Sequence, residues 1–250
     1  MESCKKFFFK TLRLLAIFAI IYVCILFYMA ISERRYAFPR AQADKTAAET
    51  LEKHAVLCRT NDGKKLQGWI LNDSLSNTVL YFADTGEDAA TFLENAKGIS
   101  NVRIVGFNYR GSAGSEGSPG EKFYEGDVLA MIGCAGSENP IFLGHGTGGI
   151  AAYNAFVKGY GKKAILVDPY ENFRDKLSGR YRIFFPEFLI RTKIGMRFDG
   201  EGTKRATIVL DNPGRRESVQ KILDAHPEKF DVIDRKGASL LKILKEILEK

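Results

Sequence analysis

Hydrophobic and polar positions alternate in blocks after residue 50, and the blocks switch between two periods. Short apolar runs are typical of buried strands, and the first two predicted strands flank an Asp-Gly turn that indicates a hairpin. These patterns predict strands at 54–60, 66–71, 77–83, 102–109, 140–145, 163–170, 207–210 and 230–234. Apolar positions three and four apart predict helices at 87–97, 123–132, 151–160, 217–225 and 238–249. This alternation predicts an α/β fold, a mostly parallel sheet of about seven or eight strands with helices on both faces.

Two segments do not follow this alternation of strands and helices. Residues 171–204 are rich in aromatic and basic side chains, and we expect a small cap-like insertion there, over the C-terminal edge of the sheet. Residues 33–50 are predominantly polar and contain Pro39, which indicates a linker. The predicted organisation is therefore an N-terminal segment (1–32), a linker (33–50) and an α/β domain (51–250).

The N-terminal segment contains an uncharged apolar run at residues 14–31, which as a helix is roughly 27 Å long and nearly spans the hydrocarbon core of a bilayer. A cleaved signal peptide is the alternative, but its apolar region is usually shorter and followed closely by small residues. Here the run ends in the bulky residues Phe27, Tyr28 and Met29, so a retained single-span membrane anchor is favoured.

Basic residues lie on both sides of this run, so the positive-inside rule discriminates little. The short N-terminal tail is the easier part to leave in the cytoplasm, which predicts that the domain lies on the non-cytoplasmic side.

Charge and cysteine content exclude some partners. The net charge is +7, but residues 1–40 hold seven basic and two acidic residues, and the remaining residues hold 30 and 28. The basic excess thus flanks the anchor and argues against nucleic acid as a partner. Cys58 and Cys134 are isolated and are expected to be two small buried apolar side chains. No spacing of cysteine and histidine predicts a metal, and we expect no cofactor.

Four stretches resemble the α/β-hydrolase superfamily, particularly its small membrane-anchored serine-hydrolase-like members. They follow one another in the family's order and at its intervals: TNDGKKLQGW (60–69), NYRGSAGSEG (108–117), GHGTGG (144–149) and VDPYENF (167–173). The resemblance implies a nucleophile elbow, a strained turn between strand and helix that carries a serine flanked by glycines.

The chain departs from the family at this elbow, which spans Gly144, His145, Gly146, Thr147 and Gly148. Gly146 stands where the resemblance places the serine, so the nucleophile oxygen is missing. The family's catalytic histidine follows the last strand, but the loop after Asp234 reads Arg-Lys-Gly-Ala-Ser. Its acid follows the preceding strand, where Asp211 comes early and Arg215 lies near the expected position.

The oxyanion loop of the family corresponds to Ala83 and Asp84, together with Thr147, the residue after Gly146 in the elbow. A carboxylate at Asp84 would oppose negative charge developing on a substrate oxygen. The strand ends also offer a candidate binding crevice, made of Tyr109, Arg110, Asp168 and Tyr170.

Several independent losses predict a catalytically inactive pseudo-hydrolase that binds a protein partner or a small apolar ligand. The alternative is a hydrolase of the esterase, thioesterase or peptidase class with a relocated, atypical active site. Thr147, Ser112 and Ser115 are the candidate nucleophiles for it.

Overall fold

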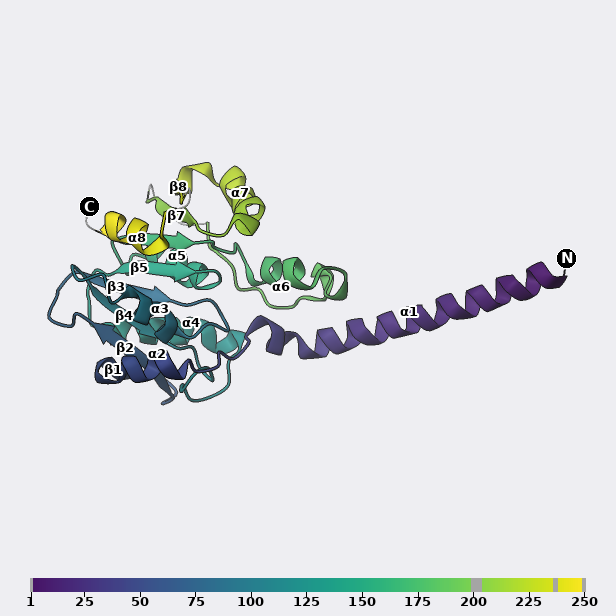
Figure 1. Cartoon of the computed structure of the whole chain (residues 1–250), viewed down its shortest axis with the longest axis horizontal. Helices are drawn as coiled ribbons and strands as arrows, with labels where there is room; N and C mark the ends of the chain where they lie inside the picture. The colour runs from purple at the N-terminus through teal and green to yellow at the C-terminus, as the bar shows by residue number, and fades with distance from the viewer. Residues whose placement is uncertain (1, 199–203, 236–237, 249–250) are drawn as a thin grey trace.

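The computed structural model describes residues 2–198, 204–235 and 238–248, and within them it forms one eight-stranded sheet (Figure 1). The strand order is β1-β2-β4-β3-β5-β6-β7-β8. The strands are β1 (Ala55–Arg59), β2 (Lys65–Leu71), β3 (Thr78–Phe82), β4 (Arg103–Phe107), β5 (Ile141–His145), β6 (Lys163–Val167), β7 (Ala206–Leu210) and β8 (Phe230–Asp234). All eight predicted strands are confirmed.

Strand β2 is antiparallel to both of its neighbours, β1 and β4, and the pairs from β4 to β8 are parallel. The hairpin between β1 and β2 turns at Gly63, whose φ of +79° is the left-handed conformation that glycine adopts freely. Parallel strands bring their carboxyl ends to one edge of the sheet, so the turns after β3, β5 and β6 meet there.

Helices cover both faces, as predicted. The helices of the domain are α2 (Lys45–Thr50), α3 (Ala89–Ala96), α4 (Glu121–Cys134), α5 (Gly148–Val157), α6 (Phe173–Tyr181), α7 (Arg216–Ala225) and α8 (Leu240–Leu248). Side chains of α4, α5 and α7 share one hydrophobic cluster, and those of α2, α3 and α8 share the other. Helix α5 begins at Gly148, earlier than the predicted start at residue 151, because it follows the elbow directly.

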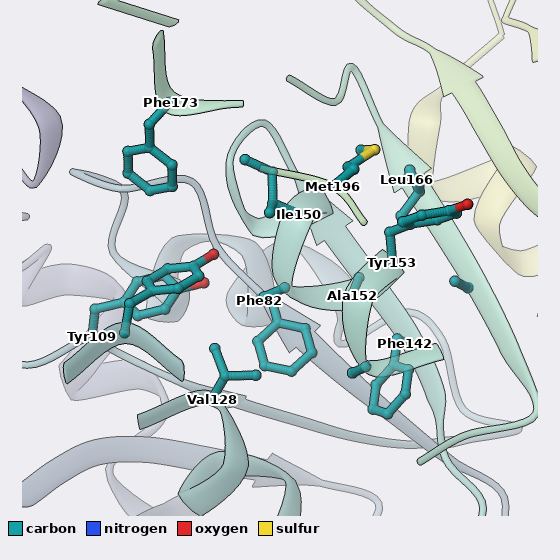
Figure 2. Close-up of a cluster of buried hydrophobic side chains, with 14 of the residues drawn as sticks. Phe82, Tyr109, Val128, Phe142, Ile150, Ala152, Tyr153, Leu166, Phe173 and Met196 are labelled. Carbon is teal, nitrogen blue, oxygen red and sulfur yellow. The ribbon is translucent and has the colours of Figure 1, made fainter. Parts of the chain in front are cut away.

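The two clusters arise from the alternation of side chains along each strand. In β3, Leu80 and Phe82 belong to the first cluster, whereas Val79 and Tyr81 belong to the second. Figure 2 shows part of the first cluster, in which Phe82, Phe142 and Leu166 from β3, β5 and β6 gather with side chains of α5. The residues after β3 and β5 are therefore held by a rigid support.

The N-terminal segment is helix α1 (Glu2–Ala37), which projects away from the domain on the side of α6 (Figure 1). The helix over residues 5–37 is long and apolar enough to cross a membrane, and its most apolar stretch has a mean hydropathy of 2.8. The expected polar linker at 33–50 is wrong in part: α1 continues to Ala37, α2 occupies 45–50, and Ala37, Phe38 and Ala47 are buried. These small and aromatic side chains pack on the domain, which keeps the segment from being a free tether.

The segment predicted as an insertion contains helix α6 and two short 3-10 helices, η2 (Arg182–Phe184) and η3 (Glu187–Leu189). It returns to its own start through a bridge between Asn172 and Gly195. Residues 199–203 lie outside the described residues.

The expectation for the two cysteines of the domain is wrong. Cys58 in β1 and Cys134 at the end of α4 form a disulfide, with Cα atoms 5.6 Å apart and a sequence separation of 76. Helix α4 packs on β1, and this packing brings together two residues whose spacing in the sequence carries no signal.

Candidate functional site

The turn after β5 has the backbone geometry of a nucleophile elbow. Gly146 has φ +54°, and its N–H donates to the carbonyl of Val167 at the end of β6. A Cβ on Gly148 would lie 2.0 Å from the carbonyl oxygen of Phe82 and 2.5 Å from that of Ala83, so only glycine allows α5 to start this close to β3. The predicted sharp turn at Gly146 is confirmed.

The space in front of Gly146 is occupied by the side chain of Asp84. A Cβ built on Gly146 would meet Asp84 Cγ at 2.7 Å and its Cβ and Oδ1 at 3.0 Å. Carbon atoms in contact normally stay about 3.5–4.0 Å apart. The carboxylate of Asp84 therefore fills the position from which a nucleophile's side chain projects in this kind of turn.

The same carboxylate takes up the donors around the turn. Asp84 Oδ1 accepts from the backbone N–H of Thr147 at 3.0 Å and also from the Thr147 hydroxyl. The N–H of Thr85 donates to Thr147 Oγ1 at 3.0 Å, and that of Asp84 donates to Glu87 Oε2 at 3.0 Å. An oxyanion hole consists of the N–H after the nucleophile and one from the loop after β3. Here these N–H groups already bind side chains of the chain itself.

Lys176 from α6 closes this cluster. Its Nζ donates to Asp84 Oδ1 at 2.8 Å, to Thr85 Oγ1 at 2.7 Å and to the Thr85 carbonyl at 3.1 Å. Lys176 is 4% exposed and Thr147 is fully buried. An ion pair between the buried Lys176 and the partly buried Asp84, whose side chain is 24% exposed, thus holds the insertion over the elbow.

Burial and pairing act in opposite directions on the two charged groups. Burial alone would raise the pKa of Asp84, but Lys176 and Thr147 outweigh it and hold that pKa below its usual value. Burial lowers the pKa of Lys176, and the charge of Asp84 opposes the shift. The carboxylate is therefore ionised at neutral pH and is held by a cation within hydrogen-bonding distance.

Sequence reasoning identified Asp84 and Thr147 but missed Lys176 and Glu87. A partly buried carboxylate needs a cation or hydrogen-bond donors, so Asp84 does predict a partner of some kind. Which cation reaches it depends on how the insertion folds back over the sheet, and no spacing in the sequence encodes that.

His145 points to the loop after β3. Its Nδ1 lies 2.7 Å from Glu87 Oε2, and Glu87 Oε1 accepts from the Tyr81 hydroxyl at 2.7 Å. Burial alone would lower the pKa of His145, but Glu87 reverses this and raises it above the usual value. His145 therefore forms an ion pair with Glu87 when it is protonated, and the pair stabilises the loop that carries Asp84.

The two other histidines lie at different places. His54 is in a 3-10 helix before β1, and His226 follows α7 and stacks on Phe198 with ring centroids 3.6 Å apart. Where the resemblance expects the acid and the base, Asp211 forms an ion pair with Arg235, the residue after β8. Asp211 is the first residue beyond β7. Lys236 and Gly237 lie outside the described residues.

Two residues of the candidate crevice, Asp168 and Tyr170, do lie at the strand ends beside the elbow. Asp168 follows β6 with φ +44°, and its carboxylate accepts from the N–H groups of Asp211 and Asn212 at 3.0 and 2.8 Å. Burial raises the pKa of Asp168. The Tyr170 ring lies 3.5 Å from the guanidinium carbon of Arg215. Asp168 thus stabilises the turn after β7.

The other two residues of the candidate crevice are buried. The guanidinium of Arg110 binds Asp62 through two hydrogen bonds of 2.7 and 2.8 Å and Asp127 through two of 2.9 and 2.6 Å. Tyr109 stacks on Tyr124, and both rings belong to the hydrophobic cluster in Figure 2. The structure therefore does not bring Arg110 together with Asp168 as a binding group.

The alternative nucleophiles are engaged in structural hydrogen bonds. Ser112 Oγ accepts from the N–H of Ala41 at 3.1 Å, and Ser112 is buried. Ser115 Oγ accepts from the N–H of Gln67 and donates to the carbonyl of Asn108, both at 2.9 Å. Thr147 is bound within the Asp84 cluster.

A half-open cavity of about 390 Å³ lies away from the elbow, between α4, α5 and residues 193–197. Apolar side chains such as Val128, Ile132 and Met196 line it, and Lys158 and Glu125 form an ion pair at its rim. Its volume lies in the range of small-molecule sites. Within the described residues, no group of three histidine, cysteine or acidic side chains could hold a metal ion.

The strand order, the antiparallel β2 and the elbow after β5 together define the α/β-hydrolase fold. Solved structures with this fold are similar over most of the chain. An esterase from Pyrococcus furiosus is 14% identical, with a TM-score of 0.61 over 85% of this chain and 98% of that one. An α/β hydrolase from Vibrio vulnificus is 15% identical, with a TM-score of 0.60 over 84% and 85%.

A third similar structure is the bottromycin epimerase BotH in complex with bottromycin A2, which is 14% identical, with a TM-score of 0.58 over 78% of this chain and 98% of that one. No model of a known protein family matches the chain. No curated protein matches it by sequence either. The likeness therefore establishes the fold, and the function has to be argued from the site.

Proposed function

We propose that this chain is a membrane-anchored pseudo-hydrolase, an α/β-hydrolase-like protein that binds a ligand or a partner and does not hydrolyse one. A single observation carries the proposal: the carboxylate of Asp84, paired with Lys176, occupies the space in front of Gly146. A negative charge in this place repels the oxyanion that acyl transfer must stabilise. The N–H of Thr147, which would bind that oxyanion, donates to the same carboxylate.

The missing chemistry supports the same conclusion. Gly146 has no side-chain oxygen, and the Arg235–Asp211 ion pair joins the ends of β7 and β8 where an acid and a base would be needed. Triad members act as a unit, so the loss of more than one leaves little catalysis.

The full-length chain, purified in mild detergent, tests this proposal. We expect no hydrolysis of short acyl esters above the buffer blank and no labelling by a fluorophosphonate probe. Gly146→Ser is expected to remain without turnover, because a base is still missing. Hydrolysis at about 1 s⁻¹ or faster would refute the proposal. If that activity disappeared in Thr147→Val, Ser112→Ala or Ser115→Ala, a relocated active site would be established.

The binding role draws on the cavity between α4 and α5. We expect native mass spectrometry to detect a small molecule that co-purifies with the full-length chain and is lost in Ala155→Phe, which fills the cavity. Leu57→Phe, an exposed substitution on β1, is the matched control. Absence of any adduct in the unmodified chain would count against a small ligand and favour a protein partner.

Membrane anchoring is the remaining part of the proposal. Helix α1 is long and apolar, and only 6% of its most apolar stretch is buried against the domain. The Cys58–Cys134 disulfide favours a domain in an oxidising compartment, hence on the non-cytoplasmic side. Carbonate extraction is expected to leave the full-length chain in the membrane pellet. A mature chain that begins near Asp44 would instead establish a cleaved signal peptide.

A further inference from the structure

The insertion lies along α1 rather than over the sheet alone. Tyr181 packs edge-on against Tyr36 with ring centroids 5.0 Å apart, and the N–H groups of Arg191 and Thr192 donate to the Glu33 carboxylate at 2.7 Å each. Further along the helix, the Tyr22 hydroxyl donates to the carbonyl of Ile183 at 2.7 Å. The loop of η2 and η3, residues 182–189, therefore runs beside the apolar part of α1.

The position of Tyr22 sets the depth of this loop. Tyr22 lies nine residues before the end of the uncharged run at Ile31, which is about 13 Å along a helix. A tilt of about 40° between α1 and the bilayer normal shortens the depth to about 10 Å. If residues 14–31 cross the hydrocarbon core, Ile183 is level with the acyl chains.

Moving the membrane-spanning part of α1 along the helix until the loop lies in water would carry an energetic penalty. The span would have to move towards the N-terminus, which draws Arg13 and then Lys10 into the hydrocarbon core. The Tyr22 hydroxyl also needs a hydrogen-bond acceptor within the apolar phase, and the carbonyl of Ile183 supplies one. Both considerations keep the loop beside the span.

The loop has the side chains that such a position requires. Phe188 is 80% exposed, Ile183 66% and Phe184 47%, although each is large and apolar. Exposed apolar groups that adjoin one another and a membrane helix are typical of membrane-contacting surfaces. Exposed cations lie at the first position of the loop and on both sides of it in the sequence, namely Arg182, and Arg174, Arg180, Arg191 and Lys193. Basic side chains around an apolar tip match the phosphate layer of a bilayer.

We propose that the η2–η3 loop is a second membrane contact, which inserts Ile183, Phe184 and Phe188 into the leaflet that α1 enters from the domain. The proposal rests on the proposed anchoring role of α1. The occupant of this surface is a phospholipid bilayer, because Ile183 is hydrogen-bonded to Tyr22 within the apolar run of α1 and the neighbouring apolar side chains of the loop are exposed. The edge of the sheet that carries Gly146 is then held close to the membrane surface.

Depth-dependent fluorescence quenching in proteoliposomes tests the proposal on the full-length chain. Phe188→Trp places a reporter at the tip of the loop. The matched control is Tyr160→Trp. Tyr160 is an exposed aromatic residue that follows the C-terminal end of α5, away from the elbow at the other end of this helix. The unmodified chain, whose single tryptophan Trp69 is buried, gives the background. The liposomes contain phosphatidylcholine, with or without bromine on the acyl chains.

We expect brominated lipid to remove more than half of the emission added by Phe188→Trp and to protect it from aqueous iodide, while Tyr160→Trp shows the opposite behaviour. Ile183→Trp gives a second reporter if Phe188→Trp does not fold. The proposal is overturned if iodide quenches the loop tryptophan and brominated lipid does not, while the chain still resists carbonate extraction. That result leaves the anchoring role of α1 intact. Release of the chain by carbonate removes the anchor and the second contact together.

Discussion

Gly146→Ser is the substitution that would restore the missing oxygen, and the structure predicts that it destabilises the fold. A serine at this position must adopt φ near +54°, which costs about 1–3 kcal/mol for a residue other than glycine. Its Cβ would lie 2.7 Å from Asp84 Cγ, about 1 Å closer than carbon atoms pack. Such overpacking typically adds about 1–3 kcal/mol. The expected loss in the free energy of unfolding is therefore about 2–6 kcal/mol.

Two reference variants separate these contributions. Gly136 has φ +63°, and a Cβ added there would meet nothing within 4 Å, so Gly136→Ser measures the backbone contribution alone. The double variant Asp84→Gly, Lys176→Met removes the obstructing side chain together with the charge that would otherwise be left buried without a partner. In this background Gly146→Ser is expected to lose only about 1–3 kcal/mol, close to the value of Gly136→Ser.

Urea unfolding of the full-length chain in mild detergent, followed by the emission of Trp69, measures each free energy. We expect a coupling of about 1–3 kcal/mol between position 146 and the Asp84–Lys176 pair. A loss for Gly146→Ser that is the same in both backgrounds, within about 0.5 kcal/mol, would show that Asp84 does not occupy this space.

Three further changes report on the supports of the site. Replacing Cys58 and Cys134 together by alanine is expected to lower stability by up to about 4.5 kcal/mol in urea unfolding, because the disulfide joins residues 76 apart; no loss would show that it does not form. Arg110→Met leaves a buried carboxylate without its cation and is expected to lower stability by about 3–5 kcal/mol in the same assay, whereas a loss near zero would contradict the buried network. Because the pKa of His145 is raised in the folded state, its pairing with Glu87 stabilises the fold fully below a pH of about 6.5, and this stabilisation is lost as the pH rises through the folded-state pKa. His145→Gln is therefore expected to lower the free energy of unfolding more at pH 6 than at pH 9. Equal losses at both pH values would contradict this pairing.

The sheet and the elbow were predictable because their signals are local. Runs such as residues 140–145 are apolar on both faces, and the glycines at 144, 146 and 148 follow from the close crossing of β5, α5 and β3. Even the departure at Gly146 is visible in the sequence. Those predictions required only strand periodicity and the steric limits of one turn.

The contents of the site were less predictable because they depend on contacts between distant segments. Lys176 reaches Asp84 across 92 positions, and Glu33 binds Arg191 across 158. Arg110 looked like a binding group because it follows a buried strand, but Asp62 and Asp127 neutralise it from other elements. A charged residue in a family motif therefore does not reveal whether it faces a ligand or a counterion within the protein.

The junction between α1 and the domain has a consequence for how the molecule meets its partners. Glu33 is 4% exposed and accepts hydrogen bonds from Arg191 and Thr192, and Ala37 and Phe38 continue directly into the core. The domain therefore has little rotational freedom about α1, unlike a domain on a flexible tether. If α1 spans a membrane as proposed, the domain would diffuse in the plane of the membrane with one side always directed outward, and a partner would have to present its complementary surface at a fixed height and angle above the lipid.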